Sequence, residues 1–386
     1  MIAHEKRAHA ILSASGAHRW MHCTPSALIE AGLPDTTSEA AKEGTLAHEI
    51  AEQKLRGYFK PDNAFRDVVI KKLKRDALYQ PEMDGYTDEY LDYCKAAALE
   101  WEKAPYIAIE RKLDLSEYIP GGFGTADCIM IGDRRLRIID FKYGKGVPVS
   151  ADDNEQLKIY ALGVIAAYRQ LFDIDFIEMS IFQPRISNIS TCTMPIGDLL
   201  AFGEMVKEKA AVAIKGEGKQ TPGDWCRFCR ARAQCVARAE KNVEMAFLTR
   251  DSVELMTNDD IGGYLERGRD VARWLKDLED YALRQCLAGK SVPGWKAVEG
   301  RGSRSWTDQD EAFKRLEDSG VSEAMLYERK PITLAQTEKL IGKKEFNSIV
   351  GDLVEKKPGK PTLVEESDKR EAITNITKAA EAFKED

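Results

Sequence analysis

The chain has 386 residues, of which 43% are hydrophobic and 31% charged, as in an ordinary soluble protein with room for two or three domains. No run approaches the roughly 20 apolar residues of a membrane helix, and the first residues lack an apolar core of signal-peptide length. We therefore expect no membrane partner and a cytoplasmic location. The net charge of −7 argues against non-specific coating of nucleic acid. It does not exclude local binding of a polyanion, because the relevant field is local.

Residues 1–60 are predicted to be helical, with Ser38 capping a helix that carries GTLAHEIAEQKL. A polar segment over 61–82, predicted to be a loop or short-helix connection, separates them from a second helical stretch over 84–103. Three short segments rich in β-branched residues follow, YIAIERKLDL, GTADCIMIG and LRIIDFKYG, and they predict three consecutive strands. DNEQLKIYALGVIAAYRQL predicts a helix, IDFIEMSIFQP a fourth strand, and 196–214 another helix.

The remainder is predicted to be a loop, GEGKQTPGDW, then a cysteine-rich segment, and then one or two long helices over 252–288. From about Gly289 we expect a short strand, a small helical segment and an extended tail. These patterns predict four regions, which are an N-terminal helical region (1–103), an α/β core with the cysteine segment (104–240), a helical extension (241–290), and a small C-terminal domain with its tail (291–386).

A hairpin within 124–142 is expected to bring two aspartates together. The run GDRR lies between two strand-like segments and can form a tight turn. A turn centred on the Asp–Arg bond of this run places Asp127 opposite Asp140. Facing side chains have Cβ atoms about 4.5–5.5 Å apart, and like charges there destabilise a sheet. A divalent cation between them would reverse that effect, and hard oxygen ligands suit Mg²⁺ or Mn²⁺.

Four more residues fit the same site. Lys142 lies two residues beyond Asp140 and so projects from the same strand face, where an ammonium would orient or deprotonate a water. Gln156 and Tyr160 share a helix face, and His48 is a candidate metal ligand. The alternatives are a surface hairpin with unrelated charges and an ordinary helix histidine. The apolar run IIDF weighs against the first, because an unpaired buried aspartate is costly.

Three of the eight cysteines, Cys226, Cys229 and Cys235, lie within ten residues, which indicates a metal with Cys23 as the leading fourth ligand. Zinc usually takes two CxxC pairs, and only one is present. We therefore favour a [4Fe–4S] cluster, with zinc as the alternative. We expect this cluster to join the N-terminal helices to the segment after the core, with cluster chemistry as the alternative. The candidate contacts to nucleic-acid phosphates are Arg227, Arg230 and Arg232.

In this order the residues resemble the motifs of RecB-type nucleases of the PD-(D/E)xK superfamily. The likeness is closest to members with an iron–sulfur staple, such as the CRISPR-adaptation nucleases and the AddAB-type helicase–nucleases. That family carries a glycine and a histidine on a helix, then G-x-x-D, D-x-K and Q-x-x-x-Y. The matching residues here are Gly44 and His48, Gly124 and Asp127, Asp140 and Lys142, and Gln156 and Tyr160. Its strand glutamate matches Glu110, and its one-plus-three cysteine pattern also matches.

Each of these motifs is weak alone, whereas the ordered set is specific and covers roughly residues 10–240. The tail KPGKPTLVEESDKREAI additionally resembles a phage or prophage family catalogued only as a domain of unknown function. No Walker-type GKT or GKS is present, so we expect no fused helicase motor.

The resemblance implies an α/β fold of restriction-endonuclease type, in which helices flank a mixed central sheet, with the cysteine staple and a mostly helical C-terminal extension. It implies a DNA exonuclease that uses Mg²⁺ or Mn²⁺ to resect ends for recombination in a bacterial cytoplasm. Expected partners are single-stranded DNA or duplex ends and a phage single-strand annealing protein. Two alternatives remain, a non-catalytic DNA-binding scaffold on a degenerate nuclease fold and a zinc-binding interaction module.

The resemblance also assigns roles to the site residues. The metal ligands would be His48, Asp127, Asp140 and the carbonyl of Phe141, with Glu110 in support. Lys142 would position the attacking water. Gln156 and Tyr160 would position Lys142 or contact the DNA strand.

Overall fold

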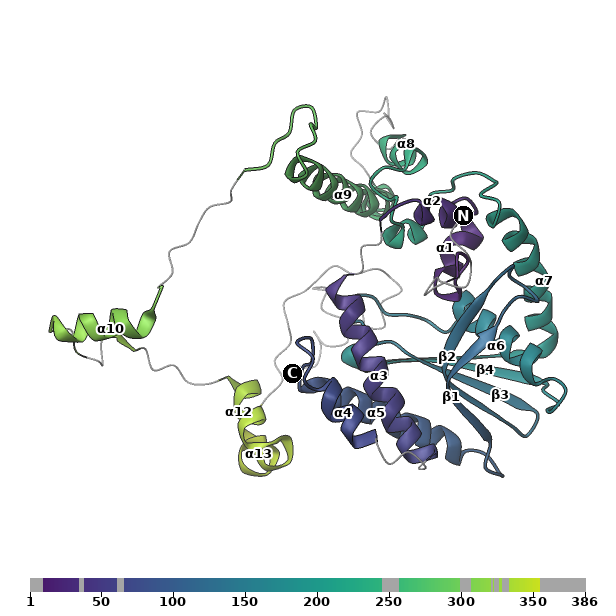
Figure 1. Ribbon diagram of the computed structural model, residues 1–386, viewed down its shortest axis with the longest axis horizontal. Helices are drawn as coiled ribbons and strands as arrows, with labels where there is room; N and C mark the ends of the chain where they lie inside the picture. Colours follow the sequence, from purple (N-terminus) through teal and green to yellow (C-terminus); the bar gives the residue numbers. More distant parts are fainter. Residues whose placement is uncertain are drawn as a thin grey trace, which may run out of the picture. The chain divides into compact units, whose positions relative to one another are not determined.

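The computed structural model of the chain describes residues 10–34, 38–60, 66–244, 257–298, 307–320, 322, 326–327 and 333–354 (Figure 1). They belong to two compact units, Met1–Val298 and Glu299–Asp386. The second unit contains α10 (Gln309–Asp318), α12 (Leu334–Ile341), α13 (Lys343–Val350) and η6 (Gly351–Leu353). The tail expected beyond it lies outside the described residues. The four predicted regions stay predictions.

The first unit is built on a five-stranded sheet with the order β1-β2-β3-β4-β5. All neighbouring pairs are antiparallel except β3 and β4, which are parallel. A parallel pair needs a crossover connection, and α6 supplies it. The predicted mixed sheet with flanking helices is therefore confirmed. The strands are β1 (Tyr106–Asp114), β2 (Phe123–Gly132), β3 (Arg135–Phe141), β4 (Phe176–Gln183) and β5 (Asn188–Pro195).

The predicted β2–β3 hairpin is confirmed in its register. Gly132 pairs with Arg135 and Cys128 with Ile139, so the turn is centred on the Asp133–Arg134 bond. Both turn residues have positive φ, 43° and 57°, as the tight hairpin turns that suit twisted strands require. The β2–β3 pairing ends at Cys128 and Ile139, one residue short of the two aspartates.

Helices cover both faces of the sheet (Figure 1). On one face α1, α6 and α7 share a core with strand residues such as Ile129 and Ile138. On the other face α3 and α5 pack over Cys128 and Ile139. Ser38 caps α3 through its side chain, as expected. The helices of this unit are η2 (Ala14–Gly16), α1 (Ala17–His22), α2 (Ser26–Ala31), α3 (Glu39–Phe59), α4 (Arg66–Leu73), α5 (Glu82–Leu99), α6 (Glu155–Tyr168), η3 (Pro184–Ile186), α7 (Ile196–Ala213), η4 (Asp224–Phe228), α8 (Val236–Glu244) and α9 (Asn258–Leu287).

Strand β5 is one of the elements that were not predicted from the sequence, as is helix α8. Strand β5 is the clearer case. Its residues alternate between half-buried and exposed, so they contain no apolar run of the kind that marked the other strands. The short strand expected after Gly289 is reduced to a single bridge between Val292 and Trp295; residues 299–306 lie outside the described residues. Among the described helices, none combines the length and the apolar character needed to span a bilayer.

Candidate functional site

A backbone kink in β1 determines where two carboxylates of the candidate site point. In a regular strand, residues an odd number of positions apart point to opposite faces of the sheet. Ala108 and Leu113 are five apart, yet both pack in the same core, so the side-chain direction along β1 switches between them. The reversal falls at Glu110, whose φ is +46°, and the β1–β2 pairing skips Glu110 and Asp127. Such local breaks in a ladder re-aim side chains. Both carboxylates thereby reach the side of the sheet that α3 covers.

His48 on α3 meets these two carboxylates. Its Nδ1 lies 3.6 Å from Asp127 Oδ1 and 3.9 Å from Glu110 Oε1. The ligand atoms of all three side chains lie within 4.8 Å of one another, which is close enough to hold one metal ion. Burial lowers the pKa of His48, but the negative charge of Asp127 and hydrogen bonds to both carboxylates outweigh it and raise this pKa to about 10. The imidazolium therefore serves as the counter-ion of the two carboxylates.

On the α6 side a chain of polar contacts surrounds Asp140. Lys142 Nζ lies 3.0 Å from Asp140 Oδ2 and donates to Gln156 Oε1, also at 3.0 Å. The Gln156 amide donates to Asp140 Oδ1 at 3.4 Å and to the Tyr160 hydroxyl at 3.2 Å. As predicted, the side chains of Asp140 and Lys142 contact each other, and so do those of Gln156 and Tyr160. Tyr160 is buried, which favours its positioning role over direct contact with DNA.

The two aspartates are linked through the backbone of β3. The Phe141 N–H donates to Asp127 Oδ2 at 2.7 Å, so this carboxylate continues the ladder where backbone pairing ends. Phe141 also sets its ring edge-on against His48, with centroids 5.2 Å apart. That the Phe141 carbonyl is a metal ligand stays a prediction. We call the set His48, Glu110, Asp127, Asp140, Lys142, Gln156 and Tyr160 the acidic site.

The carboxylates of the acidic site differ in their proton affinity. Burial would raise the pKa of Asp127, but the His48 charge and the hydrogen bonds lower it. Burial raises the pKa of Asp140, and the charge of Asp127 adds to this although Lys142 acts in the opposite direction. Burial also raises the pKa of Glu110. Asp140 Oδ2 is buried, and Lys142 Nζ at 3.0 Å is its charged partner. The neighbouring His–Glu–Asp set offers carboxylate oxygens and one imidazole nitrogen, a ligand set that fits an oxygen-preferring divalent cation.

Gly124 holds Tyr160 in place by having no side chain. A Cβ at this position would lie 2.8 Å from Tyr160 Cε1, which is closer than real Cβ contacts come. The close approach of Tyr160 therefore explains why a glycine occupies this position of the G-x-x-D motif. Gly44 differs, because a Cβ there would meet nothing within 4 Å among the described residues.

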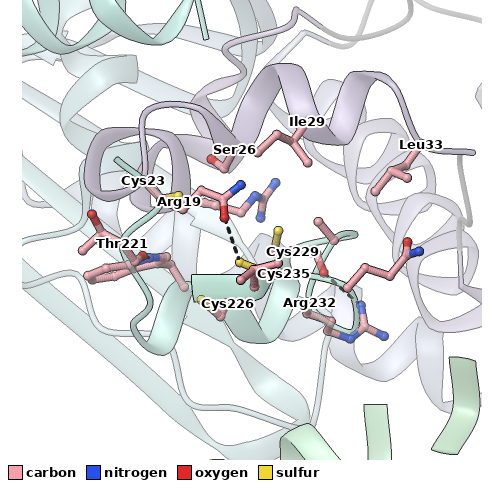
Figure 2. A pocket seen from close by; sticks show the side chains of 15 residues that line it. Arg19, Cys23, Ser26, Ile29, Leu33, Thr221, Cys226, Cys229, Arg232 and Cys235 are labelled. Carbon is pink, nitrogen blue, oxygen red and sulfur yellow. Dashed lines mark hydrogen bonds between the residues drawn. The ribbon is translucent and has the colours of Figure 1, made fainter. Parts of the chain in front are cut away.

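The four predicted cluster cysteines line one cavity of about 240 Å³ (Figure 2). We call it the cysteine pocket, and its thiols are Cys23, Cys226, Cys229 and Cys235. Cys23 ends α1, whereas the other three lie in and after η4, about 200 residues later. All eight cysteines of the chain are free. The pocket thus joins the N-terminal helices to the segment after the core, as expected for the staple.

Burial raises the pKa of Cys226, and it raises that of Cys229 to about 11, so both are neutral thiols without a metal. Within the described part of the chain, no set of three pocket thiols has all its sulfurs within 4.8 Å of one another. Four sulfurs at one zinc ion, with bonds of about 2.3 Å, would be closer, roughly 3.8 Å apart.

The three arginines expected to meet phosphates differ in availability. Arg232 Nε donates to Asp277 on α9 at 2.8 Å, so its charge already has a partner. Arg227 is exposed and lies over the ring of Phe228. Arg230 is exposed, and its backbone N–H donates to Glu30. Their contact with nucleic acid stays a prediction.

One group of potential metal ligands was not predicted from the sequence. It consists of His18 and His22 of α1 with Glu155 of α6. The two histidines are four apart, which is a helical spacing that could have been noticed. Glu155 could not have been linked to them, because 133 residues separate it from His22.

Fold and site together define a mixed α/β protein that gathers carboxylates, a histidine and a lysine where the β2–β3 pairing ends. The sequence model of the DUF2800 family, described as proteins of unknown function, matches residues 9–371, and the chain belongs to this family. Among solved structures it is similar to one titled "Crystal structure of SSO0001". Their identity is 15% over 50% of this chain and 85% of that chain, with a TM-score of 0.22. A TM-score this low carries no argument.

Proposed function

We propose that the protein is a Mg²⁺- or Mn²⁺-dependent deoxyribonuclease that acts on DNA ends. The observation that carries the proposal is the acidic site. It pairs a His–Glu–Asp ligand set with a buried aspartate that is held by a lysine and a glutamine. A purely structural arrangement has little use for two buried carboxylates beside a half-buried third, because each buried carboxylate costs several kcal/mol of desolvation (roughly) unless it is compensated.

The ion would be held by His48, Asp127, Asp140 and the carbonyl of Phe141, with Glu110 in support. When bound, such an ion polarises the scissile phosphate and lowers the pKa of a water. His48 must release its proton to become a ligand. Its place as counter-ion of Asp127 is then free for the cation.

Lys142 supplies the fixed positive charge of the acidic site. Two acceptors, Asp140 and Gln156, determine the position of its ammonium group. An ammonium held in this way can orient the attacking water and offset the charge of a phosphate. The Gln156 amide nitrogen donates to Asp140 and to Tyr160, and its oxygen accepts from Lys142, so these contacts together define its orientation.

We further propose that the cysteine pocket holds a [4Fe–4S] cluster that acts as a structural staple. Its support is the set of four free thiols that line one cavity. Arg19 and Arg232 also line the pocket, and each is paired with a carboxylate, Glu30 and Asp277 respectively.

The choice of DNA, of exonuclease action in recombination and of a phage annealing protein as partner rests on the resemblance of the motifs. So does a bacterial cytoplasmic setting. The acidic site itself supports hydrolysis of a phosphodiester.

Digestion of end-labelled single- and double-stranded DNA in Mn²⁺ tests the proposal. We expect Asp140→Asn and Lys142→Ala to lower the cleavage rate by about 10²–10⁴-fold, because each removes a group that touches the reacting centre. DNA binding in Ca²⁺ should persist. Lys158→Ala is the matched control, since Lys158 lies on α6 and its Nζ makes another Lys–Asp contact, 2.9 Å from Asp153 Oδ1.

Cleavage at the wild-type rate by both site variants would reject the assignment. If the wild-type chain binds DNA without cleaving it in Mn²⁺, the protein is instead a non-catalytic DNA-binding scaffold. A colourless protein that contains zinc but no iron would favour the zinc-binding module.

A further inference from the structure

A second group of potential metal ligands lies outside both the acidic site and the cysteine pocket. It consists of His18, His22 and Glu155, and we call it the His–Glu cluster. His18 Nδ1 lies 3.2 Å from each carboxylate oxygen of Glu155. His22 Nε2 lies 3.1 Å from Glu155 Oε1. All three ligand atoms are within 4.8 Å of one another.

These separations match the edges of a coordination shell. Zinc bonds to nitrogen and oxygen at about 2.0–2.2 Å, so neighbouring ligand atoms around one ion are roughly 3.0–3.6 Å apart. The observed nitrogen–oxygen distances of 3.1 and 3.2 Å lie in this range. An ion can replace the hydrogen bonds with little movement of the side chains.

The cluster is built by two helices that are remote in sequence, α1 and α6. Helix α1 places its two histidines one turn apart on the same face. Glu155 belongs to the first turn of α6, and only 17% of its side chain is exposed, so its carboxylate is held toward α1. The histidine rings remain partly exposed, at 48% and 43%, which leaves a route for an ion from solvent.

Asp224 provides the outer partner that histidine ligands usually have. His18 Nε2 lies 3.2 Å from Asp224 Oδ2, on the opposite side of the ring from Glu155. A histidine that binds a metal through one nitrogen commonly donates its other N–H to a carboxylate, and this bond sets the tautomer. The next residue, Trp225, stacks on His22 with centroids 4.5 Å apart and planes at 15°. Asp224 therefore orients the His18 ring, and Trp225 orients the His22 ring.

We propose that the His–Glu cluster binds Zn²⁺ and that the ion ties α1 to α6 and to the segment before Cys226. Two imidazoles and one carboxylate suit zinc, whereas Mg²⁺ prefers oxygen ligands. Each ligand segment adjoins a proposed centre, because Cys23 follows His22, Gln156 follows Glu155, and Cys226 follows Trp225. Zinc here braces the acidic site against the cysteine pocket.

Calorimetric titration of Zn²⁺ into the untagged full chain tests the proposal. We expect a zinc site that is lost in the double variant His18→Asn/His22→Asn. His48→Asn is the matched control, because it removes a histidine from the acidic site and should leave this affinity unchanged. Asp224→Asn should weaken zinc binding by about 10–100-fold, as loss of an outer partner does. Zn²⁺ should also raise the thermal midpoint of the wild type but not of the double variant.

Co²⁺ as a spectroscopic substitute separates the His–Glu cluster from the cysteine pocket. Nitrogen and oxygen ligands give weak visible bands, whereas thiolates add intense charge-transfer bands. Equal zinc affinity of wild type and double variant would overturn the proposal. So would a Co²⁺ spectrum dominated by thiolate bands that vanish in Cys226→Ser. Should the double variant fail to fold, the mild surface change Asp224→Asn decides, and an unchanged zinc affinity then refutes the site.

Discussion

The acidic site and the cysteine pocket lie in the same unit but are held in different ways. In the acidic site, strand backbone and neighbouring side chains orient the functional groups, as the bond from the Phe141 N–H to Asp127 shows. In the cysteine pocket the thiols come from the end of a six-residue helix and from a short 3-10 segment, and they surround a cavity. The first site is organised by the fold. We expect the second to need its ligand to be stable.

We therefore expect substitutions in the acidic site and in the cysteine pocket to have different effects. Changes in the acidic site should alter chemistry while the fold survives, since the sheet supplies the packing. Changes in the cysteine pocket should release the N-terminal helices, because binding energy at such a centre is folding energy.

Cys226→Ser should give the largest loss of stability, about 3 kcal/mol or more, because it removes a ligand from the proposed cluster. Iron content and the free energy of unfolding in guanidinium measure it. Cys286→Ser is the control, since Cys286 contacts the Trp295 carbonyl outside the pocket. If the Cys226→Ser protein keeps its iron and its stability, the cysteine pocket does not depend on a ligand held by Cys226.

Gly124→Ala should destabilise the protein by about 1–3 kcal/mol, because the new methyl group overlaps Tyr160 in a packed core. Denaturant unfolding measures this cost. Gly85→Ala in α5 serves as the control, since a Cβ there meets nothing within 4 Å. Cleavage should fall together with stability, because Tyr160 no longer supports Gln156. A stable, fully active Gly124→Ala protein would show that the acidic site tolerates movement of this tyrosine.

The affinity for Mn²⁺ should rise about tenfold per pH unit, or 1.4 kcal/mol, between roughly pH 7 and 9. The pKa of His48 is raised to about 10, so throughout this window the free protein holds a proton that a metal must displace. As the pH rises toward that pKa, displacement becomes easier. Titration at several pH values measures the slope, which His48→Asn should abolish. A flat profile in the wild type would mean that His48 is not a ligand.

Gly44→Ala should have the smallest effect and the opposite sign, a gain of about 0.5–1 kcal/mol in stability, because alanine is favoured over glycine inside a helix. Gly44 lies one turn before His48 on α3, with open space around it. We expect the KM for DNA to rise, since the space beside the acidic site would be used by substrate. An unchanged KM would place the DNA elsewhere.

Local patterns predicted much of the first unit. The β2–β3 hairpin follows from a two-residue turn between β-branched runs, and its register determines which residues end the ladder. The D-x-K and Q-x-x-x-Y spacings needed only strand and helix periodicity. Strand β5 escaped prediction because an edge strand with alternating exposure lacks an apolar run.

By itself the sequence determined the elements, the hairpin register and the order of the motifs, because these depend on residues a few positions apart. Only the tertiary structure decided that His48 stands between Glu110 and Asp127, since a kink with positive φ re-aims β1 there. It alone brought Glu155 to the histidines of α1. Contacts across more than a hundred residues depend on how the helices pack on the sheet, and no local spacing encodes that packing.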